Sequence, residues 1–226
     1  MSEFEKKLSQ LKADLNTQGD RVSDQLLQAV ESSFGGDSSA AKKVIDGDEF
    51  IDRVDVEIER ACIDLLRLGV NDEHNIRSVL TIVKVNNELE RIADCAVIVA
   101  ESAMKSDKLI SLAPPTFRVM ANSVVGMTRD TTMSLSEADT ELAVRVLSFD
   151  DTVSRFRKEI VLDVQHRTSN GELNPLVAFE LLAVTRSLER IADHCTNICE
   201  QVIYLETGKI VRHLPEGWTS PETPAF

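Results

Sequence analysis

Apolar residues recur along much of this chain at alternating spacings of three and four, which is the period of an amphipathic helix. The pattern is clearest in two stretches, whose apolar positions are Ile82, Val85, Leu89, Ile92, Ala96, Val99 and Ala103, and Leu181, Val184, Leu188, Ile191, Cys195, Ile198, Val202 and Leu205. Both stretches contain the sequence Leu-Glu-Arg-Ile-Ala-Asp, at 89–94 and 188–193. A repeat with matching neighbours predicts that one unit was doubled to build the fold.

Glycine and proline divide the periodic sequence into six long segments. Glycine favours the C-terminal end of a helix and proline its first turn, so helix ends are expected at Gly35-Gly36, Gly69, Pro114-Pro115 and Gly208. Residues 168–171 are expected to form a further turn. We therefore predict helices over about 4–34, 37–68, 71–108, 115–136 and 139–167, and from that turn to 207.

The second and fifth predicted helices also correspond to each other. The residues that match in order and spacing are Asp37, Ala41, Val44 and Asp48, and Asp139, Ala143, Val146 and Asp150. Each half therefore has three helices joined by short turns, which makes neighbouring helices antiparallel. The expected fold is all-α, with two pseudo-symmetric antiparallel three-helix bundles at residues 1–110 and 111–213, followed by a flexible tail at 214–226.

The composition restricts both the core and the partners. Of the residues, 42% are hydrophobic and only 4% aromatic, which favours an aliphatic helical core over a β-sandwich. The formal charge is −13, so nucleic acid and anionic lipid are unfavourable partners, and cations or a basic protein surface are better ones. No stretch has the roughly 20 apolar residues of a membrane span, and the N-terminus lacks the apolar core of a signal peptide. We expect a cytoplasmic protein without direct membrane insertion.

Acidic residues recur along three predicted helices. Those of the third helix and the sixth point away from the apolar positions: Glu90, Asp94 and Glu101, and Glu189, Asp193 and Glu200. Those of the second helix lie beside its apolar positions: Asp48, Asp52, Asp55 and Glu59. Two carboxylates one helical turn apart destabilise an isolated helix by roughly 0.2–0.5 kcal/mol. If the second and third helices pack side by side, their carboxylates converge on one patch that needs a neutralising partner.

Clustered carboxylates are hard oxygen ligands, which suit metal ions. We predict a first metal site at Asp48, Asp52, Glu90 and Asp94, a weaker second site at Asp150, Glu189 and Asp193, and additional candidate ligands at Asp55, Glu101 and Glu200. The second site is expected to be weaker because Ser154 stands where the first half has Asp52, and Arg157 adds a positive charge. The candidate ions are divalent or trivalent: iron, manganese, magnesium, calcium or zinc.

The same acidic residues also fit an ordinary solvated helix face. Arg91 lies three positions before Asp94, and Arg190 lies three before Asp193, so each aspartate has a salt-bridge partner within reach on its own helix. From the spacing alone, the metal site and the solvated face both remain open.

Signals for catalysis are scarce. The chain has no Gly-rich phosphate loop, no Gly-x-Ser-x-Gly and no His-Glu-x-x-His. A di-iron helical-bundle oxidase needs Glu-x-x-His pairs, which are also missing. Cys195 and Cys199 lie one turn apart beside His194, but their place in the apolar pattern favours reduced core residues over a zinc site. We predict that the protein is not an enzyme.

The repeated motif, Glu90 to Asp94 and Glu189 to Asp193, resembles the PhoU family of bacterial phosphate-signalling proteins. The similarity includes residues 44–48 and 195–200 and extends from about residue 5 to His213. The resemblance implies a cytoplasmic, all-helical, dimeric protein that restrains the phosphate-starvation response. Its implied partners are a sensor histidine kinase and the ATPase subunit of the phosphate ABC transporter.

Some members of that family bind metal clusters through paired acidic motifs. Carried over to this chain, the pairs are Asp48 and Asp52 with Glu90 and Asp94, and Asp150 with Glu189 and Asp193. The expected function is therefore a negative regulator and adaptor with metal-binding faces. The alternative is an accessory or metal-storage protein that does not contact a kinase.

Overall fold

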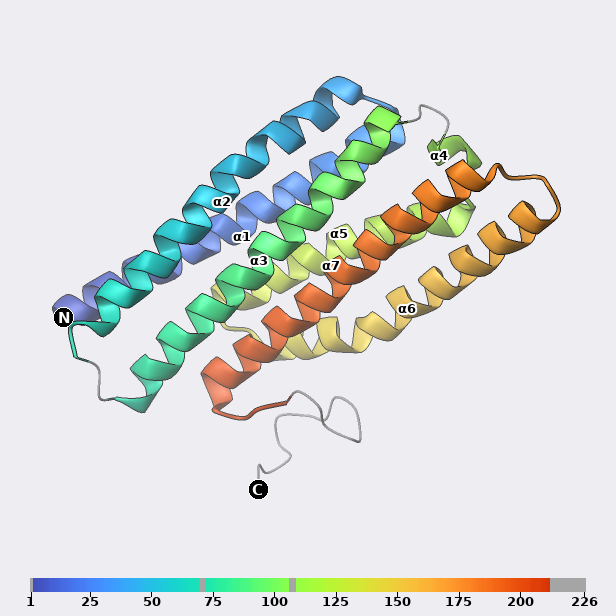
Figure 1. The fold of residues 1–226 in the computed structure, drawn as a ribbon. Helices are drawn as coiled ribbons and strands as arrows, with labels where there is room; N and C mark the ends of the chain where they lie inside the picture. Colours follow the sequence, from blue (N-terminus) through green and yellow to red (C-terminus); the bar gives the residue numbers. More distant parts are fainter. Residues whose placement is uncertain (1, 70–71, 106–108, 212–226) are drawn as a thin grey trace.

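The structure, a computed structural model, describes residues 2–69, 72–105 and 109–211. Within these ranges the chain forms helices and no strands: α1 Glu3–Gly35, α2 Ser38–Leu66, α3 Glu73–Lys105, α4 Leu109–Leu112, α5 Pro115–Glu137, α6 Thr140–Ser169 and α7 Pro175–Thr207 (Figure 1). The predicted all-α fold with six long helices is confirmed, and α4 is one additional turn. Predicted positions 71, 106–108 and 214–226 lie outside the described residues.

Helix ends follow the capping chemistry of the sequence. Ser2 and Glu5 form a capping box at the start of α1, and the Asp37 carboxylate accepts hydrogen bonds from two backbone N–H groups at the start of α2. Gly36 and Gly208 follow α1 and α7 in the left-handed region, at φ 64° and 73°. A residue with a side chain would be strained in this conformation, so glycine is the favoured residue at these two helix ends.

Two details of the prediction were wrong. The expected turn at 168–171 begins too early, because α6 continues through Ser169: the Thr168 and Ser169 hydroxyls donate to the carbonyls of Val164 and His166 at 2.7 and 2.8 Å. The short helix α4 was missed because four residues cannot display a helical period. Its first residue, Leu109, is buried in the common core.

The helices form two bundles that share one core. Helices α1, α2 and α3 pack against one another, and so do α5, α6 and α7. The bundles meet where α3 packs on α7 and α1 packs on α5, whereas α2 and α6 lie on the two outer sides (Figure 1). At the α1–α5 contact, a Cβ atom on Gly19 would lie 3.2 Å from Thr132 Cγ2, so glycine permits the close approach.

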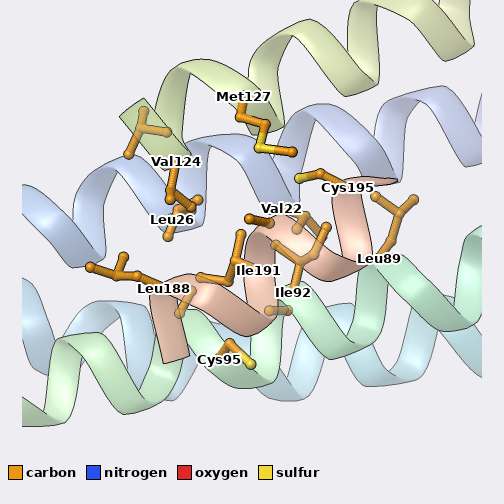
Figure 2. Close-up of a cluster of buried hydrophobic side chains, with 14 of the residues drawn as sticks. Val22, Leu26, Leu89, Ile92, Cys95, Val124, Met127, Leu188, Ile191 and Cys195 are labelled. Carbon is orange, nitrogen blue, oxygen red and sulfur yellow. The ribbon is translucent and has the colours of Figure 1, made fainter. Parts of the chain in front are cut away.

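The two copies of the repeated motif cross at the centre of the α3–α7 contact. The helices are antiparallel: Glu88 contacts Asn197, and further back along α3, Arg77 packs on Gly208. Figure 2 shows the crossing, where apolar side chains of α3 and α7 meet side chains of α1 and α5. The labelled residues are Leu89, Ile92 and Cys95 on α3, Leu188, Ile191 and Cys195 on α7, Val22 and Leu26 on α1, and Val124 and Met127 on α5.

The predicted apolar positions of α3 and α7 are confirmed as the core. Leu89, Ile92, Leu188 and Ile191 are each 0% exposed, and every other predicted position is buried except Leu205, which is half-buried. The core is almost entirely aliphatic, as the composition indicates. Within the described ranges, no helix has an apolar stretch long enough to cross a membrane.

A polar contact joins the two halves beside this crossing. The Glu88 carboxylate on α3 lies 2.7 Å from Nδ1 of His194 and accepts a 3.0 Å hydrogen bond from Asn197, both on α7. Burial raises the pKa of Glu88, but the hydrogen bonds from His194 and Asn197 and the charges of His194 and Arg91 hold it below its ordinary value. The ionised form therefore stabilises the fold at neutral pH, and this contribution is lost as the pH falls through the lowered pKa.

Candidate functional site

Five carboxylates lie on the packed pair of helices α2 and α3. We call them the first acidic cluster: Asp48, Asp52 and Asp55 on α2, and Glu90 and Asp94 on α3. Val44, Ile51 and Ile58 bury one face of α2. Because the acidic positions flank this face, packing α2 on α3 brings the five carboxylates together.

The charges within the first acidic cluster act on one another. Burial is the largest cause that raises the pKa of Asp48, Asp55 and Glu90. Repulsion adds to it, since Asp52 raises the pKa of all three and Asp94 raises that of Asp48 and Glu90. The cluster is thus a concentration of negative charge that destabilises the folded protein when every group is ionised.

In the described part of the chain, the hydrogen bonds to these carboxylates come from amide side chains, and the charge of Arg91 lowers the pKa of Glu90. The Gln25 amide donates to Asp48 at 3.0 Å from α1, and the Asn86 amide donates to Asp55 from α3 at 2.6 Å. Neither Gln25 nor Asn86 was among the predicted site residues, because their positions in the apolar pattern carry no acidic signal. No ion pair reaches any of the five carboxylates within the described ranges, and the expected bridge between Arg91 and Asp94 does not form there.

The corresponding carboxylates of the second half have a cation among them. We call Asp150 on α6 with Glu189 and Asp193 on α7 the second acidic cluster; burial and then mutual repulsion raise the pKa of Asp150 and Asp193. Arg157 Nε of α6 pairs with Glu189 at 2.9 Å, and Arg186 pairs with it at 2.8 Å. The clusters therefore differ in charge because of residues that are not duplicated.

The remaining candidates lie outside these two clusters. Glu101 is two helical turns beyond Asp94 on α3, about 10 Å along the axis. Glu200 lines a separate pocket with Lys84, between α3 and α7. The expected bridge from Arg190 to Asp193 is absent among the described residues, although the charge of Arg190 lowers the pKa of Asp193.

The cysteines do not form a metal site in this structure. Cys195 and Cys199 are fully buried beside threonine and serine hydroxyls of α5, and burial raises the pKa of their thiols to about 11 and about 12. Zinc binds the thiolate, so these protonated side chains are poor ligands. His194 is next to Cys195 in the sequence, but its Nδ1 lies 2.7 Å from the Glu88 carboxylate.

The first acidic cluster fits a hard cation by its donor chemistry and its unbalanced charge. In the present side-chain positions, no three His, Cys, Asp or Glu side chains of the described residues are gathered around a common point. Ion binding would therefore require the partly exposed carboxylates to rotate toward one another. Rotation of such side chains is fast and leaves the helices in place.

Comparison with known proteins agrees with this architecture. A model of the PhoU domain matches residues 15–103 and 117–202. The phosphate-specific transport system accessory protein PhoU homolog 1 of Thermotoga maritima is 32% identical over 216 residues, which cover 95% of this chain and 93% of that protein. The chain belongs to the PhoU family, as its repeated motif suggested.

Solved structures show the same fold. The crystal structure of PhoU from Pseudomonas aeruginosa aligns with a TM-score of 0.85 and 27% identity, over 92% of this chain and 100% of that one. The crystal structure of the phosphate transport system regulatory protein PhoU from Streptococcus pneumoniae aligns with a TM-score of 0.86 and 23% identity, over 92% and 99%. The names of these relatives describe accessory and regulatory proteins.

The repulsion in the first acidic cluster predicts that Asp52→Asn stabilises the protein. A carboxyl group whose pKa rises on folding lowers the free energy of unfolding when the group is ionised. This loss of stability disappears at a pH low enough to protonate the group in both the folded and the unfolded protein. In chelator at pH 7, Asp52→Asn should raise the free energy of unfolding by about 0.2–0.5 kcal/mol for each relieved pair. Urea unfolding measures this gain, which should vanish below the ordinary value of 3.8 for aspartate.

The matched control is Asp46→Asn, because Asp46 is exposed on α2 and lies outside the cluster. If the two variants had equal stability at pH 7, the carboxylates would not be repelling one another.

Proposed function

We propose that this protein is a negative regulator of phosphate uptake and of phosphate-starvation signalling. It acts in the cytoplasm as a homodimeric adaptor between the phosphate ABC transporter and a sensor histidine kinase, and has no catalytic activity of its own. The observation that carries this proposal is the PhoU match in both halves, together with relatives named as phosphate transport accessory proteins.

The acidic outer faces support a role in docking. The first acidic cluster is a concentrated negative charge that forms no ion pair among the described residues, although the nearby Arg91 lowers the pKa of Glu90, on a chain whose formal charge is −13. Such a surface attracts a basic patch on another protein, speeds its association and excludes anionic partners. The rigid helices hold these charges at fixed spacing, as an adaptor requires.

The regulatory step would be a population shift in the kinase. A partner that binds one conformation of the kinase more tightly moves its equilibrium toward that conformation, by no more than the difference in binding free energy. No chemistry by the adaptor is needed. The ATPase subunit of the transporter is its second proposed partner, which would link signalling to uptake.

Recovery of partners from phosphate-replete cells tests this proposal. Untagged protein should co-purify with the kinase or the transporter ATPase, identified by mass spectrometry. The double substitution Asp52→Lys and Asp94→Lys should abolish recovery, because it reverses charge on the docking face. Asp46→Lys with Glu49→Lys changes the net charge equally at exposed α2 positions outside the cluster and should leave recovery unchanged.

If neither partner is recovered while the protein retains metal, the alternative of an accessory or metal-storage protein replaces the adaptor. If both double variants recover partners equally, docking does not use the first acidic cluster.

We also propose that the first acidic cluster binds a divalent or trivalent ion through Asp48, Asp52, Glu90 and Asp94. Carboxylate oxygens would neutralise the ion and relieve the repulsion seen at Asp48 and Glu90. A weaker second site would consist of Asp150, Glu189 and Asp193. It would be weaker because Arg157 and Arg186 already form ion pairs with Glu189. Iron, manganese, magnesium, calcium and zinc are the candidate ions.

Calorimetric titration with Mn²⁺ measures the difference between the two sites. Asp52→Asn should weaken the tighter binding by about tenfold or more, whereas Asp193→Asn should leave it nearly unchanged. Asp46→Asn is the matched control and should behave as the unmodified protein. Equal losses from Asp52→Asn and Asp193→Asn would contradict the asymmetry between the two clusters.

A further inference from the structure

An open groove runs along the pair of helices α1 and α2. Its volume is about 320 Å³, and it extends from Leu11 to Arg21 on α1 and from Ala61 to Phe50 on α2. The interval from Leu11 to Arg21 is about 15 Å at the rise of an α-helix, or about three turns. Helix α3 packs against both α1 and α2 elsewhere on their surface, so the pair already holds one helix (Figure 1).

The groove lies on a different side of α2 from the first acidic cluster. At 100° per residue, Phe50 and Val54 point about 160° away from Asp48 and Asp52 around the helix axis. A ligand in the groove and an ion at the first acidic cluster would therefore occupy separate surfaces.

The second half of the chain contains the same groove in a filled form. Positions in α5 and α6 exceed their counterparts in α1 and α2 by 102, so Phe156 corresponds to Val54 and Thr116 corresponds to Asp14. Phe156 packs against the common core, and the Thr116 hydroxyl donates to the Glu159 carboxylate at 3.4 Å. In that half, a large side chain and a hydrogen bond between the helices take up the space.

Two differences leave the groove of the first half open. Val54 is smaller than the phenylalanine that stands at its counterpart. Glu57 corresponds to Glu159 and thus faces Asp14 in place of a threonine. Two ionised carboxylates cannot donate a hydrogen bond to each other, so no bridge forms between them. The middle of the groove is therefore negatively charged.

Two arginines lie at one end of the groove. The guanidinium carbons of Arg21 on α1 and Arg53 on α2 each lie 5.0 Å from the centroid of the Phe50 ring, and Phe50 is 42% exposed. Neither arginine forms an ion pair within the described ranges. A guanidinium over a ring uses its flat face and leaves its in-plane N–H donors available to a carboxylate.

We propose that this groove binds one amphipathic α-helix of a partner protein. Helices pack with the side chains of one between those of others, as α3 does against the same pair. The apolar side of the partner helix covers Phe50, Val54 and Ala61. One of its carboxylates accepts hydrogen bonds from Arg21 and Arg53, which neutralises a local positive charge on an otherwise acidic chain.

The positions of the charges define the pattern of the partner helix. Arg21 and Asp14 lie seven positions apart on α1, or about 10 Å along its axis. The partner helix therefore needs an acidic residue for the arginines and, seven positions away, a basic residue for Asp14 and Glu57. An apolar residue three or four positions from each lies on the same side and meets Val54. Any protein with such a helix fits, so the adaptor role is not required.

Fluorescence anisotropy with a synthetic peptide tests the proposal. The full chain, in EDTA, is titrated into a labelled peptide of about 15 residues, which is long enough to form a helix. The peptide carries a glutamate, a leucine and a lysine in the pattern above. A second peptide has the same composition but places both charged residues on the face opposite the leucine. The patterned peptide should bind at least about tenfold more tightly than the second.

Two substitutions copy residues of the second half into the groove. Val54→Phe introduces the side chain found at Phe156, and Arg21→Ser introduces the residue found at Ser123. Each should weaken the patterned peptide about tenfold, because the first removes space and the second removes a donor to the carboxylate of the peptide.

Each variant has a matched control. Val56→Phe makes the same change at a position that is 42% exposed on α2 and lies outside the groove. Arg145→Ser removes one positive charge at an exposed position of α6. Both controls should bind the peptide as the unmodified chain does. Circular dichroism verifies that Val54→Phe retains its helices, and Arg21 is exposed, so Arg21→Ser is expected to fold normally.

Absence of binding up to about 1 mM of the full chain would overturn the proposal, and so would equal binding of the two peptides. Unchanged affinity in Arg21→Ser would overturn the role of the arginines. Sedimentation equilibrium identifies a competing occupant: if Val54→Phe converted a dimer of the chain into a monomer, the groove would hold a second copy and the assignment to a partner protein would be wrong. None of these measurements uses the kinase, the transporter or the first acidic cluster, so failure here is distinguishable from failure of the adaptor proposal.

Discussion

The antiparallel contact between α3 and α7 is the interaction on which the rest of the structure depends. Both copies of the repeated motif meet there, and their leucine and isoleucine side chains are excluded from water. Burial of such side chains contributes roughly 1.5–3 kcal/mol each, so the crossing couples two bundles into one core. Each motif thus has two roles, since its apolar residues build the contact and its carboxylates remain on the opposite side.

Duplication explains why acidic clusters occur twice, and divergence explains why they differ. The first acidic cluster retains five carboxylates, two of which accept hydrogen bonds from amides, whereas Arg157 and Ser154 change the second. The proposed functions use the acidic outer faces of this frame for docking and for cations. A single rigid core would hold all of them at fixed distances.

Much of the fold could be predicted from the sequence because helical period and capping residues are local signals. Leu89 and Leu188 were assigned to the core from spacing alone, and both are buried. The convergence of Asp48 with Asp94 followed once the second and third helices were assumed to be neighbours. A helical period gives the direction of a side chain and leaves its neighbour undefined. For that reason the contact of Gln25 with Asp48, and the choice of Glu189 as the carboxylate that Arg157 pairs with, required the structure.

The pairing of Glu88 with His194 was missed for the same reason, since the two residues lie 106 positions apart.

Native-state hydrogen exchange at Ile92 and Ile191 tests the shared core most directly. Both amides should exchange only through global unfolding, with the same free energy and the same dependence on denaturant. If one of them exchanged through a smaller opening while the other stayed protected, the halves would be independent units and the account would be wrong.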